Sequence, residues 1–150
     1  MAEPGWKEFL KISLLPQHTN VHGTIFGGVI MSYLDQAGAH CARDGFDNRF
    51  VTVFVDGLKF LHPVYVGDLV TFRGHLVRHG TTSVTVDVVV DAERFDTREL
   101  FRVTEARLVY VAVDERGRKA RLRPRPPAIE AQHGAAGDPG SGPPAGSGAP

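Results

Sequence analysis

The amino-acid sequence predicts an α+β domain in which one long central helix is wrapped by a curled antiparallel sheet of about five strands. Apolar residues recur at three- and four-residue spacing between residues 28 and 43, which is typical of an amphipathic helix. After this helix the pattern changes to a two-residue period, which is typical of strands with one buried face. The expected order is one strand, one helix and four further strands.

The first strand is expected at residues 8–15, and the helix follows a loop. The apolar face of the helix is formed by residues that share the helical spacing: Ile30, Leu34, Ala37 and Cys41. Asp35 falls on a shoulder between this face and the polar stripe opposite, where we expect it to be only partly hydrated.

Four segments after the helix are expected to form strands: residues 50–61, 68–78, 83–91 and 106–114. A hairpin turn at His79-Gly80-Thr81 joins the middle two. The charged segment 91–102 interrupts the strand pattern, so we expect it to extend a hairpin loop.

Composition predicts one ordinary folded domain and excludes few classes of function. The chain has 150 residues, with 17 acidic and 17 basic side chains, so no global field favours nucleic acid or a membrane. A single cysteine, Cys41, cannot form an internal disulfide and is expected to be a small buried hydrophobe. The N-terminus lacks the pattern of a secretory signal and no segment reaches membrane-spanning length, so we expect a cytoplasmic protein.

The C-terminal part of the sequence changes in character. The folded domain is expected to occupy residues 1–125, and residues 126–150, rich in Pro, Gly, Ala and Ser, are expected to form a disordered tail. The basic run 116–125 could hold phosphates or an acidic partner, but a solvated linker is the default interpretation.

Candidate catalytic residues cluster in one sixteen-residue window, residues 20–35. Gly27 and Gly28 begin the helix without side chains, so the N–H groups of its first turn could bind an oxygen that becomes negative during a reaction. Asp35 follows two turns later. Taken singly, these features and Asn20 are more typical of turns and solvated residues, and only their combination favours a site.

Three blocks extend this window: HTNVHGTIFGGVIMSYLD, VTVFVDGLKFLHPVYVGDLV and HGTTSVTVDV. In this order they closely resemble the hotdog-fold acyl-CoA thioesterases of the bacterial YciA type and the cytosolic brain-type acyl-CoA hydrolases, from about Lys11 to about Asp114. The resemblance implies hydrolysis of an acyl-CoA to a free acid and CoA, a reaction of lipid metabolism. It implies Asp35 as base or nucleophile, Asn20 as the polar partner that positions water or substrate, and Gly27 and Gly28 as ligands of the thioester carbonyl.

Other residues are candidates for binding the CoA part of the substrate. Thr82 and Ser83 offer hydroxyl donors at the hairpin, Lys59 and Arg78 could contact phosphates, and His22 could touch substrate. Each has an equally good structural interpretation. Thioester hydrolysis by a carboxylate needs no metal, and we expect no cofactor beyond the CoA of the substrate.

A sheet wrapped around one helix leaves strand edges to be paired, so a homodimer is expected. The resemblance implies that Asp35 of one chain faces Asn20 and the 50–60 strand of the other, and that dimers could assemble into a hexamer. Two alternatives stay open at this point. One is a hotdog dehydratase or hydratase that pairs His22 with Asp35, and the other is a non-catalytic acyl-CoA sensor.

Overall fold

The computed structural model describes residues 5–130. Most of the predicted tail, from residue 131 onward, lies outside the described residues, as does the start of the chain before residue 5. The described elements are, in chain order, β1 (Lys7–Ser13), the 3₁₀ turn η1 (Pro16–His18), α1 (Gly27–Gly45), β2 (Arg49–Phe60), β3 (Leu69–His79), β4 (Ser83–Glu93) and β5 (Leu100–Val113). The predicted order of one strand, one helix and four strands is confirmed.

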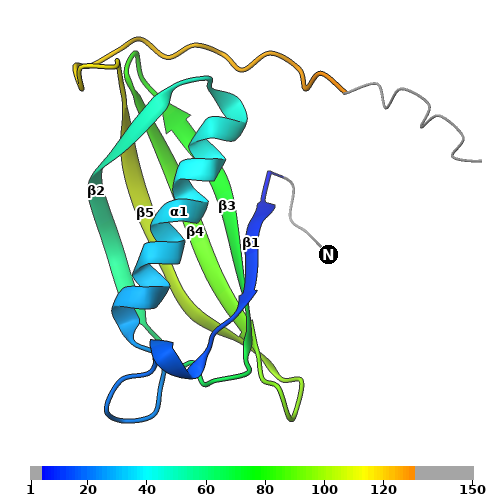
Figure 1. Ribbon diagram of the computed structural model, residues 1–150. Coiled ribbons are helices and arrows are strands. Elements are labelled where there is room, and N and C mark those ends of the chain that lie inside the picture. Colours follow the sequence, from blue (N-terminus) through cyan, green and yellow to red (C-terminus); the bar gives the residue numbers. More distant parts are fainter. Residues whose placement is uncertain (1–4, 131–150) are drawn as a thin grey trace, which may run out of the picture.

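The five strands form one antiparallel sheet in the order β1-β3-β4-β5-β2, and α1 lies along its concave face (Figure 1). β1 and β2 are therefore the two edges, and the sheet does not close. The predicted α+β architecture, a long helix wrapped by a curled five-stranded sheet, is confirmed.

The core lies between α1 and the concave face of the sheet. The four helix residues that the sequence predicts to be buried, Ile30, Leu34, Ala37 and Cys41, are all in it. They meet the alternate residues of the central strands, namely Phe72, Val84, Val86, Val88, Val90 and Leu108. The period of two along β4 and the helical spacing of α1 thus point to the same interface.

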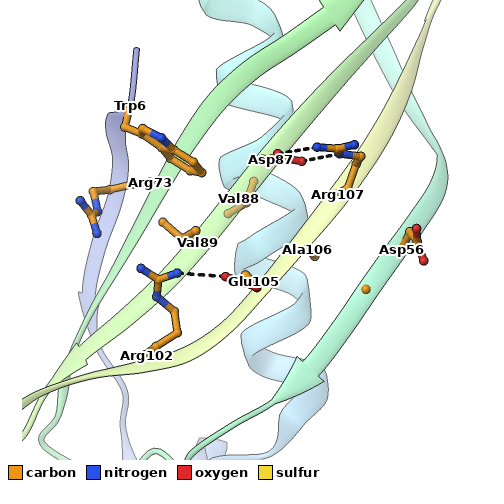
Figure 2. Close-up of a pocket in the computed structure, with 11 residues that line it drawn as sticks. Trp6, Asp56, Arg73, Asp87, Val88, Val89, Arg102, Glu105, Ala106 and Arg107 are labelled. Atoms are coloured by element: carbon orange, nitrogen blue, oxygen red, sulfur yellow. Dashed lines mark hydrogen bonds and ion pairs between the residues drawn. The ribbon is translucent and has the colours of Figure 1, made fainter. Parts of the chain in front are cut away.

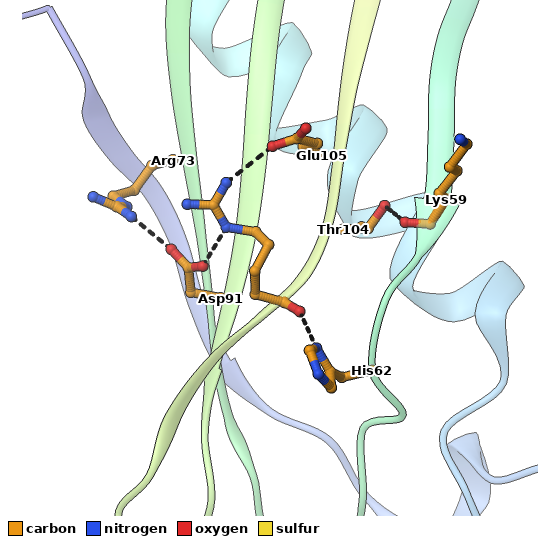
Figure 3. Close-up of polar contacts among 7 residues, drawn as sticks. Lys59, His62, Arg73, Asp91, Thr104 and Glu105 are labelled. Carbon is orange, nitrogen blue, oxygen red and sulfur yellow. Dashed lines mark hydrogen bonds and ion pairs between the residues drawn. The ribbon is translucent and has the colours of Figure 1, made fainter.

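The expected loop at residues 91–102 is wrong in extent. β4 continues to Glu93 and β5 begins at Leu100, so the loop is only 94–99. Most charged residues of the segment lie in this shorter loop. At the ends of the segment, on the convex face of the sheet, Asp91 accepts hydrogen bonds from Arg73 and Arg102, each at 2.5 Å (Figure 3). Because the ion pairs neutralise these side chains, charge does not prevent strand formation here.

The basic run is also more ordered than a solvated linker. The buried side chain of Asn48 donates to the carbonyl of Arg121 at 3.1 Å and accepts from the N–H of Arg123 at 2.9 Å. The guanidinium of Arg123 donates to the carbonyl of Asp47 at 2.8 Å. The chain after β5 therefore folds back over the C-terminal end of α1, which completes the domain.

Candidate active site

Asp35 is half-buried on α1 and its carboxylate is held from the sheet side by two hydroxyl groups. Oδ1 accepts a hydrogen bond from Oγ1 of Thr52 at 2.7 Å and from the hydroxyl of Tyr110 at 3.0 Å. Among residues 5–130, no protein group donates to Oδ2. One carboxylate oxygen is fixed and the other is available to a ligand, which is the arrangement that a base or nucleophile needs.

The two hydroxyls come from paired positions on adjacent strands. Thr52 of β2 and Tyr110 of β5 are Cα partners in the sheet, so their side chains share the concave face that α1 covers. The single proton of the Tyr110 hydroxyl is shared between Oδ1 and the main-chain carbonyl of Asp35, which lies 2.8 Å away. Burial and the nearby carboxylate of Asp35 raise the pKa of Tyr110, so its hydroxyl remains protonated and serves as a donor.

The N-terminal end of α1 presents hydrogen-bond donors without acceptors. Phe26 precedes the helix with extended backbone and no side-chain cap. In the described part of the chain, the N–H groups of Gly27 and Gly28 have no acceptor. A Cβ at Gly28 would lie 2.6 Å from the ring of Phe26, so a side chain there would displace that ring. The helix tip can bind a developing oxyanion.

An apolar hollow opens beside this tip. It has a volume of about 330 Å³ and is lined by residues of the tip, of the end of β2 and of the following loop, which include Gly27, Ile30, Phe60, Leu61, Val64 and Val103. The ring of Phe60 lies 3.3 Å from the position of a Cβ at Gly27. The volume is at the lower end of the range for small-molecule pockets.

Asp35 and the tip of the same helix are too far apart to act on one carbonyl group. They are eight residues apart, which is about 12 Å along an α-helix. A base and an oxyanion donor must both lie about 3 Å from the reacting group. One protomer therefore contains both halves of a site but does not bring them together.

Asn20 organises its own loop. Its Oδ1 accepts from the N–H groups of His22 at 2.9 Å and Thr24 at 3.3 Å, and its Nδ2 donates to Oγ1 of Thr24 at 2.8 Å. His22 is exposed and its ring makes no hydrogen bond to another described residue. Within one chain neither residue is hydrogen-bonded to Asp35, so the His22–Asp35 pair of a dehydratase is not formed.

Comparison with known proteins places this geometry in a family. Residues 22–94 match the model of the thioesterase superfamily. An uncharacterised acyl-CoA thioester hydrolase of Buchnera aphidicola is 42% identical over 125 residues, which cover 81% of this chain and 93% of that protein. The acyl-CoA thioester hydrolase YciA of Escherichia coli is 40% identical over 116 residues, 75% of this chain and 88% of the relative. The chain belongs to the thioesterase superfamily.

Solved thioesterase structures share the fold. The hexameric thioesterase y2039 from Yersinia pestis superposes with a TM-score of 0.75 at 38% identity and covers 81% of this chain and 98% of its own. The hexameric hotdog fold thioesterase Cj0915 of Campylobacter jejuni gives 0.71 at 40% identity, over 75% of this chain and 87% of its own. The predicted resemblance to hotdog thioesterases is confirmed.

The predicted CoA-binding residues of this thioesterase lie in two groups. Lys59 is exposed near the end of β2, where its carbonyl accepts from Oγ1 of Thr104 at 2.6 Å (Figure 3). Arg78, Thr82 and Ser83 lie at the β3–β4 turn, at the same end of the sheet as the start of β2, because Ser83 and Val51 both pair with Val111 of the intervening β5. The eight residues from Val51 to Lys59 separate the groups by about 25 Å. One protomer cannot place both groups on the same phosphate.

A separate pocket lies on the convex face of the sheet, opposite α1. It has a volume of about 720 Å³, and its charged walls include Arg73, Asp87, Arg102 and Arg107 (Figure 2). Arg107 donates to both carboxylate oxygens of Asp87, at 2.7 and 2.8 Å. These charges are already paired across strands, and the pocket contains none of the candidate catalytic residues.

The sequence pattern did not reveal Thr52 and Tyr110 as partners of Asp35. They lie 17 and 75 residues from Asp35, so only the sheet register brings them to it. A signal was present for Tyr110, since a tyrosine on the buried face of a strand needs a hydrogen-bond partner for its hydroxyl. No group of three or more His, Cys, Asp or Glu residues suited to a metal occurs within residues 5–130.

Proposed function

We propose that the protein hydrolyses acyl-CoA thioesters to a free carboxylic acid and CoA, with Asp35 as the catalytic carboxylate. Membership of the thioesterase superfamily and about 40% identity to acyl-CoA thioester hydrolases support the reaction. The single observation that supports the catalytic residue is the one-sided anchoring of Asp35, which leaves Oδ2 free at the edge of the sheet.

The chemistry follows from the thioester itself, because sulfur stabilises its carbonyl group poorly and a thiolate is a good leaving group. Asp35 either removes a proton from a water molecule that attacks the thioester carbon, or attacks that carbon itself to form an anhydride that water then hydrolyses. In both routes the carbon–sulfur bond breaks and CoA leaves as its thiolate. Main-chain N–H groups of Gly27 and Gly28 stabilise the oxyanion formed in the first step.

The complete site is shared by two protomers in this proposal. β2 is an edge strand with exposed apolar side chains at Val51, Val53, Phe54 and Val55. Pairing two β2 edges buries these side chains and lets Asp35 of one protomer meet the helix tip of its partner. The partner's tip then supplies the N–H donors, because the tip of the protomer that carries Asp35 lies about 12 Å from this residue. Each dimer then has two sites. Because related thioesterases of known structure are hexameric, we propose a trimer of dimers.

The acyl chain and the CoA part of the substrate occupy different ends of this shared site. The apolar hollow beside Gly27 suits an acyl chain, because most of its lining side chains are apolar. Lys59, Arg78, Thr82, Ser83 and His22 remain proposed contacts of the CoA part. Since the two groups are about 25 Å apart in one chain, they contact the same phosphate only if they come from different protomers.

The proposal needs no metal or cofactor apart from the CoA of the substrate, and it assigns the enzyme to cytoplasmic lipid metabolism. No helix among residues 5–130 has the length and apolar character needed to cross a bilayer. No observation favours the dehydratase, because His22 and Asp35 are not hydrogen-bonded within one chain and the relatives reported above are thioester hydrolases. A sensor without turnover has no use for a free carboxylate oxygen beside a thioester.

A panel of acyl-CoAs assayed for thiol release tests the proposal. Asp35→Asn keeps the shape of the side chain and an oxygen that accepts hydrogen bonds, but removes the base or nucleophile. We expect turnover to fall by at least about 100-fold. Asp96→Asn, in the exposed loop after β4, is the matched control and should retain full activity. A folded Asp35→Asn enzyme with an unchanged rate would refute the catalytic assignment.

A further inference from the structure

We infer that Tyr110 is a positioning residue for the proposed hydrolysis, because its buried hydroxyl fixes Oδ1 of Asp35 and thereby directs Oδ2 toward the thioester carbon. The inference rests on the proposed role of Asp35. Tyr110 itself touches neither substrate nor the reacting atoms in this account, since it lies behind the carboxylate on the concave face of the sheet.

The contact geometry supports this role. The hydroxyl of Tyr110 reaches two atoms of the same residue, the main-chain carbonyl of Asp35 at 2.8 Å and its Oδ1 at 3.0 Å. A group that contacts both the backbone and the carboxylate restricts the side-chain torsions of Asp35. Thr52 donates to the same Oδ1 from the neighbouring strand, at 2.7 Å. Both donors therefore bind Oδ1, and no group of the part of the chain that the structure describes donates to Oδ2.

The surroundings keep the hydroxyl in place. Tyr110 is only 1% exposed, and the edge of its ring faces Phe50, with ring centroids 6.5 Å apart. The hydroxyl occupies space that exists only because residue 38 is glycine, since a Cβ there would lie 2.2 Å from the hydroxyl oxygen. Gly38 is in the interior of α1, where glycine is less favourable than alanine. Room for the tyrosine hydroxyl explains why glycine is nonetheless present.

This arrangement has a chemical consequence. Donors on Oδ1 stabilise the anionic carboxylate, which is the form that acts as base or nucleophile. A base that can swing out of its productive orientation spends less time within reach of the substrate. Loss of the Tyr110 hydroxyl should therefore lower kcat and move the acid limb of the pH–rate profile to higher pH, with little effect on KM because substrate does not contact the tyrosine.

Tyr110→Phe tests the inference with the smallest change, the loss of one oxygen atom. We expect kcat for a good acyl-CoA substrate to fall about 10-fold or more, KM to change by less than about twofold, and the acid limb to shift to higher pH. Tyr33→Phe is the matched control: it removes the same atom from a tyrosine on α1 whose ring packs against Phe72. It should leave all three quantities unchanged.

A structural role of Tyr110 predicts a different result. The thermal midpoint would fall while kcat and the pH profile of the remaining folded enzyme stay as in the unmodified protein, and that outcome would overturn the inference. Gly38→Ala gives an independent test, because it displaces the hydroxyl while retaining the tyrosine. It should reproduce the loss of kcat, and if it does not fold, Tyr110→Phe alone decides. An Asp35→Asn enzyme that is inactive beside an unchanged Tyr110→Phe enzyme would leave the proposed function intact and reject this inference only.

Discussion

The two edges of the sheet differ in what they expose. β1 carries charged residues outward, with Lys7 paired to Asp44 and Lys11 to Glu8. β2 exposes valines and a phenylalanine on both faces, and Val53 and Phe54 are each 55% exposed. Charged edges resist pairing with another sheet, whereas a long apolar edge favours it. The comparison indicates that charge protects β1 from pairing with another strand and that β2 is suited to such pairing.

The same comparison locates the chemistry. β2 supplies Thr52 to the carboxylate of Asp35 and ends at Phe60 beside the helix tip. On the β1 side, Cys41 of α1 lies in the core and packs against Gly74 of β3. Protection of one edge and exposure of the other therefore place the candidate site where a second protomer can complete it.

Reactivity of Cys41, which lies on the β1 side, gives the largest expected effect. Burial raises the pKa of the Cys41 thiol to about 12. Since only the thiolate reacts, labelling of the folded protein by a thiol reagent at pH 8 should be about 1000-fold slower than labelling of the unfolded chain. The rate should rise about tenfold per pH unit over the alkaline range. Labelling as fast as in denaturant would show that the β1 side is open.

A charge on the β2 edge should have the next largest effect. Phe54→Lys replaces a side chain that is exposed in the single chain, so the fold should be retained, but two-fold pairing would oppose like charges. We expect light scattering to show dissociation and thiol release to fall by about 100-fold, because separated protomers hold only half of each site. Ser13→Lys adds the same charge to β1 and should alter neither mass nor rate. Equal effects at both edges would contradict the distinction between them.

Sequence periodicity was sufficient for the elements but not for contacts across the sheet. The helical spacing of Ile30, Leu34 and Ala37 predicted both α1 and its buried face, since local geometry alone determines which residues share a helix face. The charged segment between Asp91 and Arg102 led to the prediction of too long a loop, because the pairing of these two residues depends on the register of β4 and β5.

The same limit applies to the candidate site, where residues close in sequence were predictable as a group and contacts across the sheet were not. Asp35 and the two glycines lie in one short window, so their combination was visible in the sequence. Tyr110 was not, because a contact between residues 75 positions apart depends on the folding of the whole sheet. For the same reason the sequence did not show that Lys59 and Arg78 lie near opposite ends of it.

Complementation between two inactive chains tests the shared site most directly. One chain carries Asp35→Asn and the other Gly27→Pro, which removes a tip N–H at the first helical position, where proline is tolerated after the extended Phe26. Each variant alone should be nearly inactive. Mixed dimers, purified through two different affinity tags after co-expression, should recover about half of the unmodified activity, because one of their two sites combines an intact carboxylate with an intact tip. Mixed dimers that stay as inactive as their parents would show that each site lies within a single chain.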